Sequence, residues 1–147
     1  MVRQLQRGDS LLSEYRELRI QLWPDCRDDC DREIQGILSD PLQWAVFIAS
    51  PDGKKAVGFL EVRLRDYVNG ARSSPVGFLE GWYVTAKYRK QGVGEELVKA
   101  GEKWAASRGC REMGSDTQIE NEASIEVHKK LGYQEAERVV CFVKPLQ

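Results

Sequence analysis

One stretch of the chain has the residue types and spacing of a phosphate-binding turn. Gly92 and Gly94 lie two residues apart, and the basic residues Arg89 and Lys90 precede them. Glycine lacks a Cβ atom, so its N–H group can approach a bound oxygen closely. The free N–H groups and partial positive charge of a helix N-terminus also favour an anion. Between a strand and a helix, this turn predicts a cradle for a pyrophosphate.

The residues on both sides of the turn have the periodicities that such a cradle needs. Val76–Val84 alternates and predicts a strand. This alternation puts four side chains on one face of the strand, those of Phe78, Glu80, Trp82 and Val84. Apolar residues then recur at helical spacing and predict a helix from about Gly92 to Arg108, which Gly109 ends.

The spacing of the glycines excludes two other kinds of phosphate loop. The chain contains neither G-x-x-x-x-G-K-[ST] nor G-x-G-x-x-G, so it lacks the main signal for a nucleoside triphosphate or a dinucleotide. A purely structural glycine turn remains the alternative interpretation. The charges of Arg89 and Lys90 argue against it, because a structural connection does not require them.

The composition limits the architecture and the partners. With 147 residues, 41% of them hydrophobic, the chain is expected to form one domain over residues 1–147. A net charge of −1 gives no basic field for nucleic acid. The longest uncharged apolar run, Trp44–Ala49, is too short to span a bilayer. Met1–Arg7 lacks an apolar signal core, so we expect the cytoplasm.

The four cysteines do not predict a metal site. Cys26 and Cys30 are the only close pair, and His128, the single histidine, lies about a hundred residues away by the same numbering. A zinc site needs further ligands at short spacing. We expect no metal and reduced thiols.

The first half of the chain predicts a strand, a helix and a hairpin. The strand is expected at Val2–Gln6 and is followed by a helix that Asp9 or Ser10 caps and Trp23–Pro24 ends. Two alternating runs flank a turn sequence and predict a hairpin. These runs are Trp44–Ser50 and Ala56–Leu64, and the aperiodic loop Asp66–Pro75 follows them.

The segment between the helix and the hairpin is acidic. Residues 25–40 hold six acidic and two basic side chains, an excess of four negative charges, around a short helical stretch. Two interpretations remain open, a solvated face or a loop that attracts a polycation.

The last third of the chain predicts two strands around a helix. The first strand is expected at Cys110–Thr117, and the second at Arg138–Lys144. Asn121 has the position of an N-cap for a helix that extends through Leu131. His128 lies one turn after Ser124 on this helix.

Two motifs resemble the signatures of the GNAT superfamily of N-acetyltransferases. Arg89-x-x-Gly92-x-Gly94 resembles its acetyl-CoA signature, Q/R-x-x-G-x-G/A, and the helix from Asn121 to Gly132-Tyr133 resembles its second signature. The resemblance implies an α/β (α+β) fold in which helices flank a mixed central β-sheet. Many members have a tyrosine as the acid toward the CoA thiolate, where this chain has His128.

A narrower resemblance covers nearly the whole chain. Several islands, among them Gln21–Pro24, Asp66–Gly70, Phe78–Gly81 and Ser115–Thr117, are similar to the aminoglycoside 6'-N-acetyltransferases of Gram-negative bacteria. This resemblance implies acetyl transfer from acetyl-CoA to the 6'-amino group of antibiotics such as tobramycin or kanamycin, and hence resistance. It also implies a homodimer and an acidic drug site.

The resemblance also implies two sets of site residues. The drug site would be lined by Trp23, Tyr67, Glu80, Asp116 and Glu137. Acetyl-CoA would be held by Trp82, Tyr83, Val84, Arg89, Lys90, Gln91, Gly92, Val93, Gly94 and Asn121.

The residue types suit that chemistry. An aminoglycoside carries ammonium groups, which carboxylates bind, and sugar faces, which aromatic rings cover. Direct attack on the thioester requires a neutral amine held near the carbonyl carbon. We expect Asp116 to act as the base, Glu80 to serve chiefly in binding, and His128 to be a dispensable acid.

Each of these residues also has a structural interpretation. Trp23 can plug a helix end, Tyr67 can anchor a loop, and Asn121 can act only as a cap. Two functional alternatives remain as well. One is a GNAT enzyme that acts on another amine, such as a protein N-terminus, a polyamine or a metabolite. The other is a CoA-binding regulatory module without turnover.

Overall fold

The computed structural model describes all 147 residues, which form two compact units, Met1–Ser115 and Asp116–Gln147. The strands are β1 (Val2–Gln4), β2 (Trp44–Ala49), β3 (Gly58–Arg65), β4 (Val76–Val84) and β5 (Met113–Gly114). The helices are α1 (Leu12–Leu22), α2 (Cys30–Leu38), α3 (Val93–Ser107) and α4 (Glu122–Lys130), with short 3-10 turns η1 (Pro24–Cys26) and η2 (Ala86–Tyr88). Only α4 and the C-terminal segment belong to the second unit.

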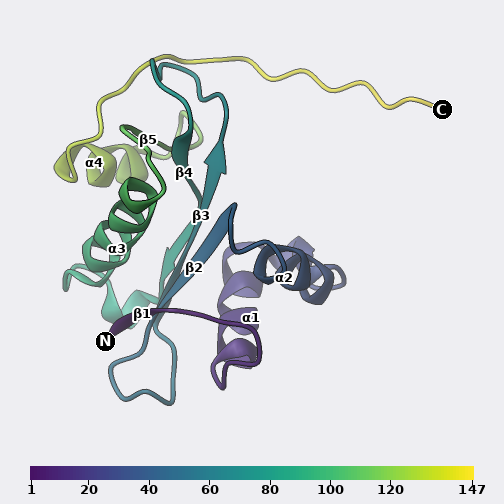
Figure 1. The fold of residues 1–147 in the computed structure, drawn as a ribbon, viewed down its shortest axis with the longest axis vertical. Helices are drawn as coiled ribbons and strands as arrows, with labels where there is room; N and C mark the ends of the chain where they lie inside the picture. Colours follow the sequence, from purple (N-terminus) through teal and green to yellow (C-terminus); the bar gives the residue numbers. More distant parts are fainter. The chain divides into compact units, whose positions relative to one another are not determined.

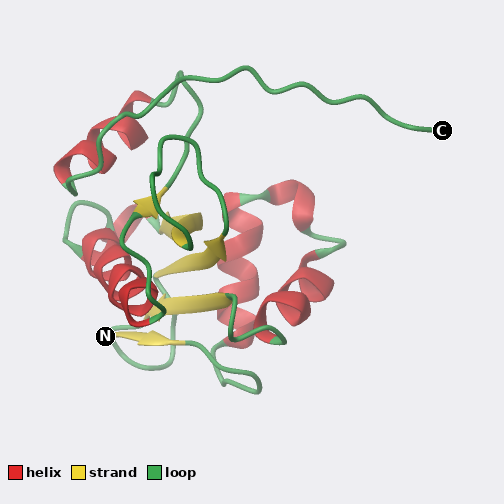
Figure 2. Ribbon diagram, turned by 45° about the horizontal axis from the view of Figure 1, so that its top comes forward, coloured by secondary structure: helices red, strands yellow, loops and turns green.

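The first unit is built on a mixed five-stranded sheet. The strands lie in the order β1-β2-β3-β4-β5, antiparallel as far as β4, with β5 parallel to β4. Helix α3 covers one face of the sheet, and α1 and α2 cover the other (Figure 1). Figure 2 shows the strands between these helices. The predicted hairpin and the predicted mixed sheet with flanking helices are confirmed.

The apolar stripes predicted for α1 and α3 form the two cores. On α1, Leu11, Tyr15 and Leu18 are at most 3% exposed, and the ring of Tyr15 meets Phe59 edge-on at 5.4 Å. On α3, Gly101 lies so close to β3 that a Cβ atom there would be 2.6 Å from a side-chain carbon of Leu60. Glycine therefore lets this helix approach the sheet more closely than any other residue would.

A β-bulge changes the faces of β4. Glu61 pairs with Gly81 and Val62 pairs with Leu79, so Glu80 is the extra residue on β4. Because directly opposed residues share a face, Leu79 lies on the α3 face with Trp82, the partner of Leu60. The prediction that Phe78, Glu80, Trp82 and Val84 share one face is therefore wrong, since it assumed unbroken alternation.

The predicted ends of α3 and α4 are confirmed, but the predicted N-cap of α1 is wrong. Asn121 caps α4 by accepting a hydrogen bond from the Ser124 N–H at 3.1 Å. Gly109 and Gly132, which follow α3 and α4, have φ values of 89° and 93°. The N-cap of α1 is Leu11, which makes no side-chain hydrogen bond to the helix. Asp9 instead accepts a hydrogen bond from the N–H of Leu11 itself, at 3.0 Å, and so lies before the capping position.

Two predicted strands differ from the structure. The strand expected at 110–117 is shortened to β5, and the one expected at 138–144 does not form. The residues of the second segment alternate as a strand requires, but a strand forms only where another edge offers hydrogen-bond partners. Its apolar side chains are exposed instead, by 58% at Val139, 77% at Val140, 89% at Phe142 and 95% at Val143.

The structure contains no membrane-spanning helix, no metal-binding cluster and no disulfide. No helix combines the length and the apolar character that a membrane span requires. No group of three or more histidine, cysteine, aspartate or glutamate residues could hold a metal ion. All four cysteines are free thiols, as expected.

Candidate functional site

The turn between β4 and α3 has an unusual backbone conformation. Lys90, with φ of 60°, is the only non-glycine residue with a positive φ, and Gly92 follows with φ of 85°. A non-glycine residue in the left-handed region costs about 1–2 kcal/mol, and such strain concentrates at functional sites. The strained backbone of Lys90 therefore marks this turn as a candidate functional site.

The N-terminus of α3 is open to a ligand. Gly92 is its N-cap and has no side chain that could accept a hydrogen bond from the first turn. A Cβ atom on Gly92 would meet no other atom within 4 Å, whereas a Cβ atom on Gly94 would lie 3.1 Å from the indole of Trp82. Gly94 thus lets Trp82 pack against the first turn, and Gly92 leaves the approach clear. This cradle fits an anionic group such as a pyrophosphate.

The side chains of the turn are anchored to the strand before it. Arg89 donates through Nε to the carbonyl oxygen of Val84 at 2.8 Å, and its guanidinium carbon lies 5.6 Å from the centre of the Tyr83 ring. Gln91 donates to the carbonyl of Lys87 at 2.8 Å. The bond from Arg89 uses only Nε, so its two Nη groups are available to an anion at the cradle.

The outer edge of β4 is open next to the cradle. The short β5 pairs with β4 only at Gly77 and Phe78. The main chain from Leu79 to Val84 therefore has no partner in β5. An extended ligand with amide groups can add to such an edge as a strand does. The predicted cofactor residues Trp82, Tyr83 and Val84 all lie on this edge.

Trp23 packs on the sheet beside the bulge. Its indole fills the space above Gly81, where a Cβ atom would come within 2.4 Å of the ring. The ring also meets Phe59 at 6.2 Å and has the Arg19 guanidinium 5.0 Å from its centre. The tertiary structure thus brings Trp23 next to Gly81, the residue that follows Glu80.

Glu80 is held by a partner that the sequence did not predict. Arg65 donates through Nε to one carboxylate oxygen at 2.8 Å and through Nη2 to the other at 2.9 Å. The guanidinium carbon of Arg65 lies 3.7 Å from the centre of the Phe78 ring. Both carboxylate oxygens of Glu80 thus already accept hydrogen bonds from a guanidinium, which agrees with a binding role for this residue. The register of β3 and β4 would have been needed to find this pair.

Tyr67 lies in the loop 66–75 and is 73% exposed. The loop itself is anchored by Val68, which is 8% exposed and packs against Phe78. Glu112 holds the far side of the loop, because it accepts hydrogen bonds from the N–H of Arg72 and the hydroxyl of Ser73. An anchored loop with an exposed ring near its start can present that ring to a ligand.

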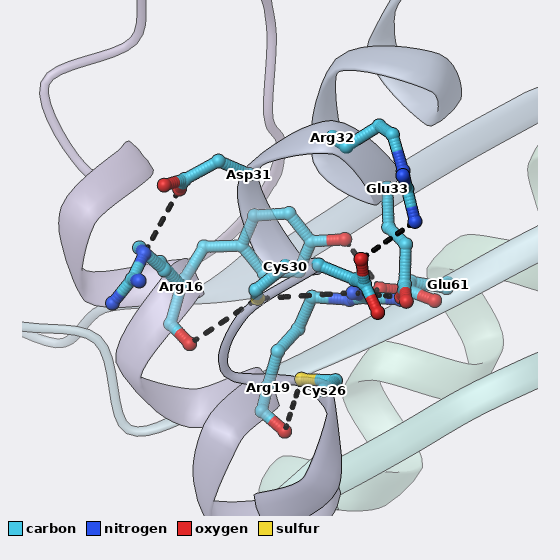
Figure 3. A network of polar contacts seen from close by, with 10 residues as sticks. Arg16, Arg19, Cys26, Cys30, Asp31, Arg32, Glu33 and Glu61 are labelled. Atoms are coloured by element: carbon cyan, nitrogen blue, oxygen red, sulfur yellow. Dashed lines mark hydrogen bonds and ion pairs between the residues drawn. The ribbon is translucent and has the colours of Figure 1, made fainter.

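Arg19, whose guanidinium lies over the Trp23 ring, belongs to a buried polar network (Figure 3). Arg19 donates through Nε to Glu61 at 2.5 Å and through Nη1 to Glu33 at 2.7 Å, and the Tyr15 hydroxyl donates to Glu61. Burial raises the pKa of Glu61, while the hydrogen bonds and charge of Arg19 act against that rise. Burial also raises the pKa of Tyr15, and the charge of Glu61 adds to this effect. Sequence analysis missed this network, because its members are far apart along the chain.

The acidic segment is partly neutralised. Three of its carboxylates have arginine partners, namely Asp29 with Arg32 at 2.6 Å, Asp31 with Arg16 at 2.8 Å, and Glu33 with Arg19 at 2.7 Å. Asp25, Asp28 and Asp40 are exposed. Part of the run is therefore a paired, solvent-facing surface, and the attraction of a polycation by the exposed carboxylates stays a prediction.

Four of the predicted site residues belong to the second unit. Asp116 and Glu137 are exposed, and Asn121 is the cap of α4. His128 Nδ1 lies 2.7 Å from the carbonyl oxygen of Ser124. A carbonyl only accepts, so Nδ1 carries the proton and Nε2 holds the lone pair in the neutral imidazole. The ring also meets Tyr133 edge-on at 5.8 Å.

Comparison with known proteins identifies the relatives of this chain. Residues 8–133 match the model of the acetyltransferase (GNAT) family. Aminoglycoside N(6')-acetyltransferase type 1 from Stenotrophomonas maltophilia is 47% identical over 134 residues, which are 90% of this chain and 86% of that protein. The protein of the same name from Klebsiella aerogenes is 45% identical over 151 residues, covering 99% of this chain and 97% of that one.

Solved structures give the same result. AAC(6')-Iy in complex with the bisubstrate analogue CoA-S-monomethyl-acetylneamine superposes with a TM-score of 0.93 at 42% identity, covering 99% of this chain and 98% of that one. The 6'-N-acetyltransferase AAC(6')-IG from Acinetobacter haemolyticus gives a TM-score of 0.91 at 35% identity, covering 100% and 99%. The resemblance seen in the sequence is confirmed: the chain belongs to the GNAT acetyltransferase family and, within it, to the aminoglycoside 6'-N-acetyltransferases.

Proposed function

We propose that this enzyme transfers the acetyl group of acetyl-CoA to the 6'-amino group of aminoglycosides of the tobramycin and kanamycin type, and so confers resistance. The likeness to AAC(6')-Iy bound to a CoA–acetylneamine analogue carries this proposal, because it extends over 99% of the chain at 42% identity. The analogue named there joins both substrates in one molecule, which supports direct transfer within a ternary complex.

The donor would be held by the cradle and the open edge of β4. Arg89, Lys90 and the N–H groups up to Gly94, including those of Gln91 and Val93, would bind the pyrophosphate. The edge from Trp82 to Val84 would hydrogen-bond the amide groups of the pantetheine arm. Asn121 would bind the same arm in addition to capping α4. When bound, acetyl-CoA supplies the activated acyl group.

The acceptor would be held by aromatic and acidic side chains. Trp23 and Tyr67 would cover sugar faces, while Glu80, Asp116 and Glu137 would bind ammonium groups. Trp23 is rigid because it packs on Gly81 and Phe59. Tyr67 stands exposed on an anchored loop. Aromatic rings and carboxylates are the side chains that suit a ligand with sugar faces and several ammonium groups.

The attacking amine must lose its proton. Asp116 is our candidate for the base because no arginine holds its carboxylate, whereas both oxygens of Glu80 are engaged by Arg65. His128 would carry a proton toward the leaving thiolate, although a thiol is acidic enough to leave without help. Strand N–H groups would stabilise the developing oxyanion.

The chain would act as one domain and as a homodimer. The family match at residues 8–133 extends across the boundary between the two units, which supports a single domain. The C-terminal arm, residues 134–147, is an extended chain whose apolar side chains are exposed by up to 95%. Pairing of this arm with a second copy would bury that surface. Because acetyl-CoA is a cytoplasmic metabolite, the enzyme would work in the cytoplasm.

Two experiments test these proposals. In the first, kanamycin A, tobramycin, spermidine and a free N-terminal peptide are offered with acetyl-CoA, thiol release is measured, and NMR locates the acetyl group. Acetylation at the 6' nitrogen supports the proposal, preference for spermidine or the peptide overturns it, and binding of acetyl-CoA without turnover points to a regulatory module. In the second, light scattering compares the chain with a variant that ends at Ala136. A dimer that becomes a monomer is expected, and a monomeric full chain contradicts the arm exchange.

A further inference from the structure

Arg65, the last residue of β3, forms an ion pair with Glu80, the carboxylate that the proposed function assigns to acceptor binding. Both oxygens of Glu80 accept hydrogen bonds from its guanidinium, at 2.8 and 2.9 Å. Glu80 is the bulged residue of β4, so it has no opposed residue on β3. The bulge is what brings its carboxylate within reach of Arg65, four residues beyond Glu61 on β3.

This ion pair differs from the one in the core. The side chains of Arg65 and Glu80 are 36% and 17% exposed, whereas those of Arg19 and Glu61 are 5% and 2% exposed. Water and a cationic ligand can therefore reach the pair. The guanidinium also rests on the ring of Phe78, which keeps it at the site whether or not both hydrogen bonds are made.

The position of the pair places a positive charge beside the acceptor site. Glu80 precedes Gly81, on which the indole of Trp23 packs. A carboxylate has about four lone-pair positions, and the fork of Arg65 uses two. An ammonium group can still bind to Glu80, but it must do so against the charge of the guanidinium.

We propose that Arg65 competes with the ammonium groups of the acceptor for Glu80, and so limits how strongly this site attracts a polycation. Arg65 thereby helps to determine which acceptors the site selects by their positive charge. The inference rests on the proposed placement of Glu80 in the drug site. A purely structural clamp would have the opposite signature, because loosening it would weaken drug binding.

The test is the variant Arg65→Gln, with kanamycin A as the acceptor. At low ionic strength we expect KM for kanamycin A to fall about fivefold, with kcat and KM for acetyl-CoA within about twofold of the wild type. The fall should shrink as salt is added, because exposed charges are screened. In a Glu80→Gln background the same change at Arg65 should lower the drug KM by much less, because only the repulsion by the guanidinium charge is then removed and the competition for Glu80 is already absent.

Two further variants make the outcome decisive. Arg65→Met keeps the aliphatic packing on Phe78 and replaces the glutamine variant if that one does not fold. Arg63→Gln removes the same charge from the same strand face, where Arg63 lies over the ring of Trp44. It should leave the drug KM unchanged.

A drug KM that is unchanged or raised in both Arg65 variants overturns the inference, as does an equal fall in the Glu80→Gln background or in Arg63→Gln. A wild-type enzyme that acetylates no aminoglycoside would instead refute the proposed function itself.

Discussion

Arg19 and Glu61 form an ion pair in the core between α1 and β3, with Nε 2.5 Å from Oε1 and both side chains at most 5% exposed. The same guanidinium bonds Glu33 of α2 and lies over Trp23 of the proposed drug site. The buried guanidinium of Arg19 thus links α1 and α2 to β3 and also contacts the Trp23 ring. Although burial opposes it, the hydrogen bonds and charge of Glu61 hold the pKa of Arg19 above its usual range.

Removal of the buried carboxylate should destabilise the fold strongly. Glu61→Gln leaves the buried Arg19 charge with Glu33, which is 42% exposed, as its one remaining carboxylate. We expect a loss of about 3 kcal/mol in the free energy of unfolding. Glu17→Gln breaks the exposed ion pair in which Arg16 Nη1 lies 3.4 Å from Glu17 Oε1. This change should cost far less, because water already screens that pair. Urea denaturation measures both. Equal losses would show that the buried pair contributes no more than a surface pair.

Gly92 offers a test of the cradle. Gly92→Val adds a side chain at the approach to the helix N-terminus and should raise KM for acetyl-CoA by about tenfold or more. Gly109→Val is the matched control, because Gly109 also has a positive φ, of 89°, and open surroundings. Both variants bear similar backbone strain, but only the first should change cofactor affinity. A folded Gly92→Val protein with normal affinity would remove the pyrophosphate assignment.

Asp116 offers a test of the base. Asp116→Asn keeps the shape and removes the charge, so kcat should fall by about 10²-fold or more and the rise of kcat with pH should be altered. Glu80→Gln should act mainly on the drug KM, because Arg65 already engages that carboxylate. The two variants are compared over a pH series. If Asp116→Asn changes only the drug KM, Asp116 is a binding anion rather than the base.

His128 should be dispensable. His128→Ala removes the Nε2 lone pair and also the contact between Nδ1 and the Ser124 carbonyl. We expect kcat to fall by less than about tenfold, because a thiolate can leave without a proton. Far-UV circular dichroism checks that α4 is retained. A complete loss of turnover in a folded variant would establish His128 as the acid.

Asp9 makes stability depend on acid pH. The hydrogen bond from Arg3, at 2.6 Å, is the main cause that lowers the pKa of Asp9 to about 2. Because the folded pKa lies below the unfolded value of about 3.9, the stabilisation is fully present above about pH 4 and is lost as the pH falls through about 2. Arg3 is 46% exposed, so we expect only about 1 kcal/mol at neutral pH.

The check is the difference in urea stability between the wild type and the variant Asp9→Asn. It should be constant between neutral pH and about pH 5 and shrink progressively below about pH 4. A difference that does not change with pH would mean that the substitution costs packing rather than charge.

The sequence by itself determined the features that depend on neighbouring residues. The glycine turn, the caps at Asn121 and Gly109, and the apolar stripe around Tyr15 were all predicted, because each depends on residues within one or two helical turns. Family membership was also determined, since several islands occur in the same order as in the relatives.

Only the tertiary structure decided the features that depend on register and on partners. The bulge at Glu80, its pairing with Arg65 and the buried charge of Arg19 join residues from separate strands and helices, and no local pattern specifies which residue faces which. The segment 138–144 is a second feature that the sequence alone did not predict correctly. Its alternation is that of a strand, but a strand exists only where a second edge supplies its hydrogen bonds, and the alternation does not specify whether such an edge is met.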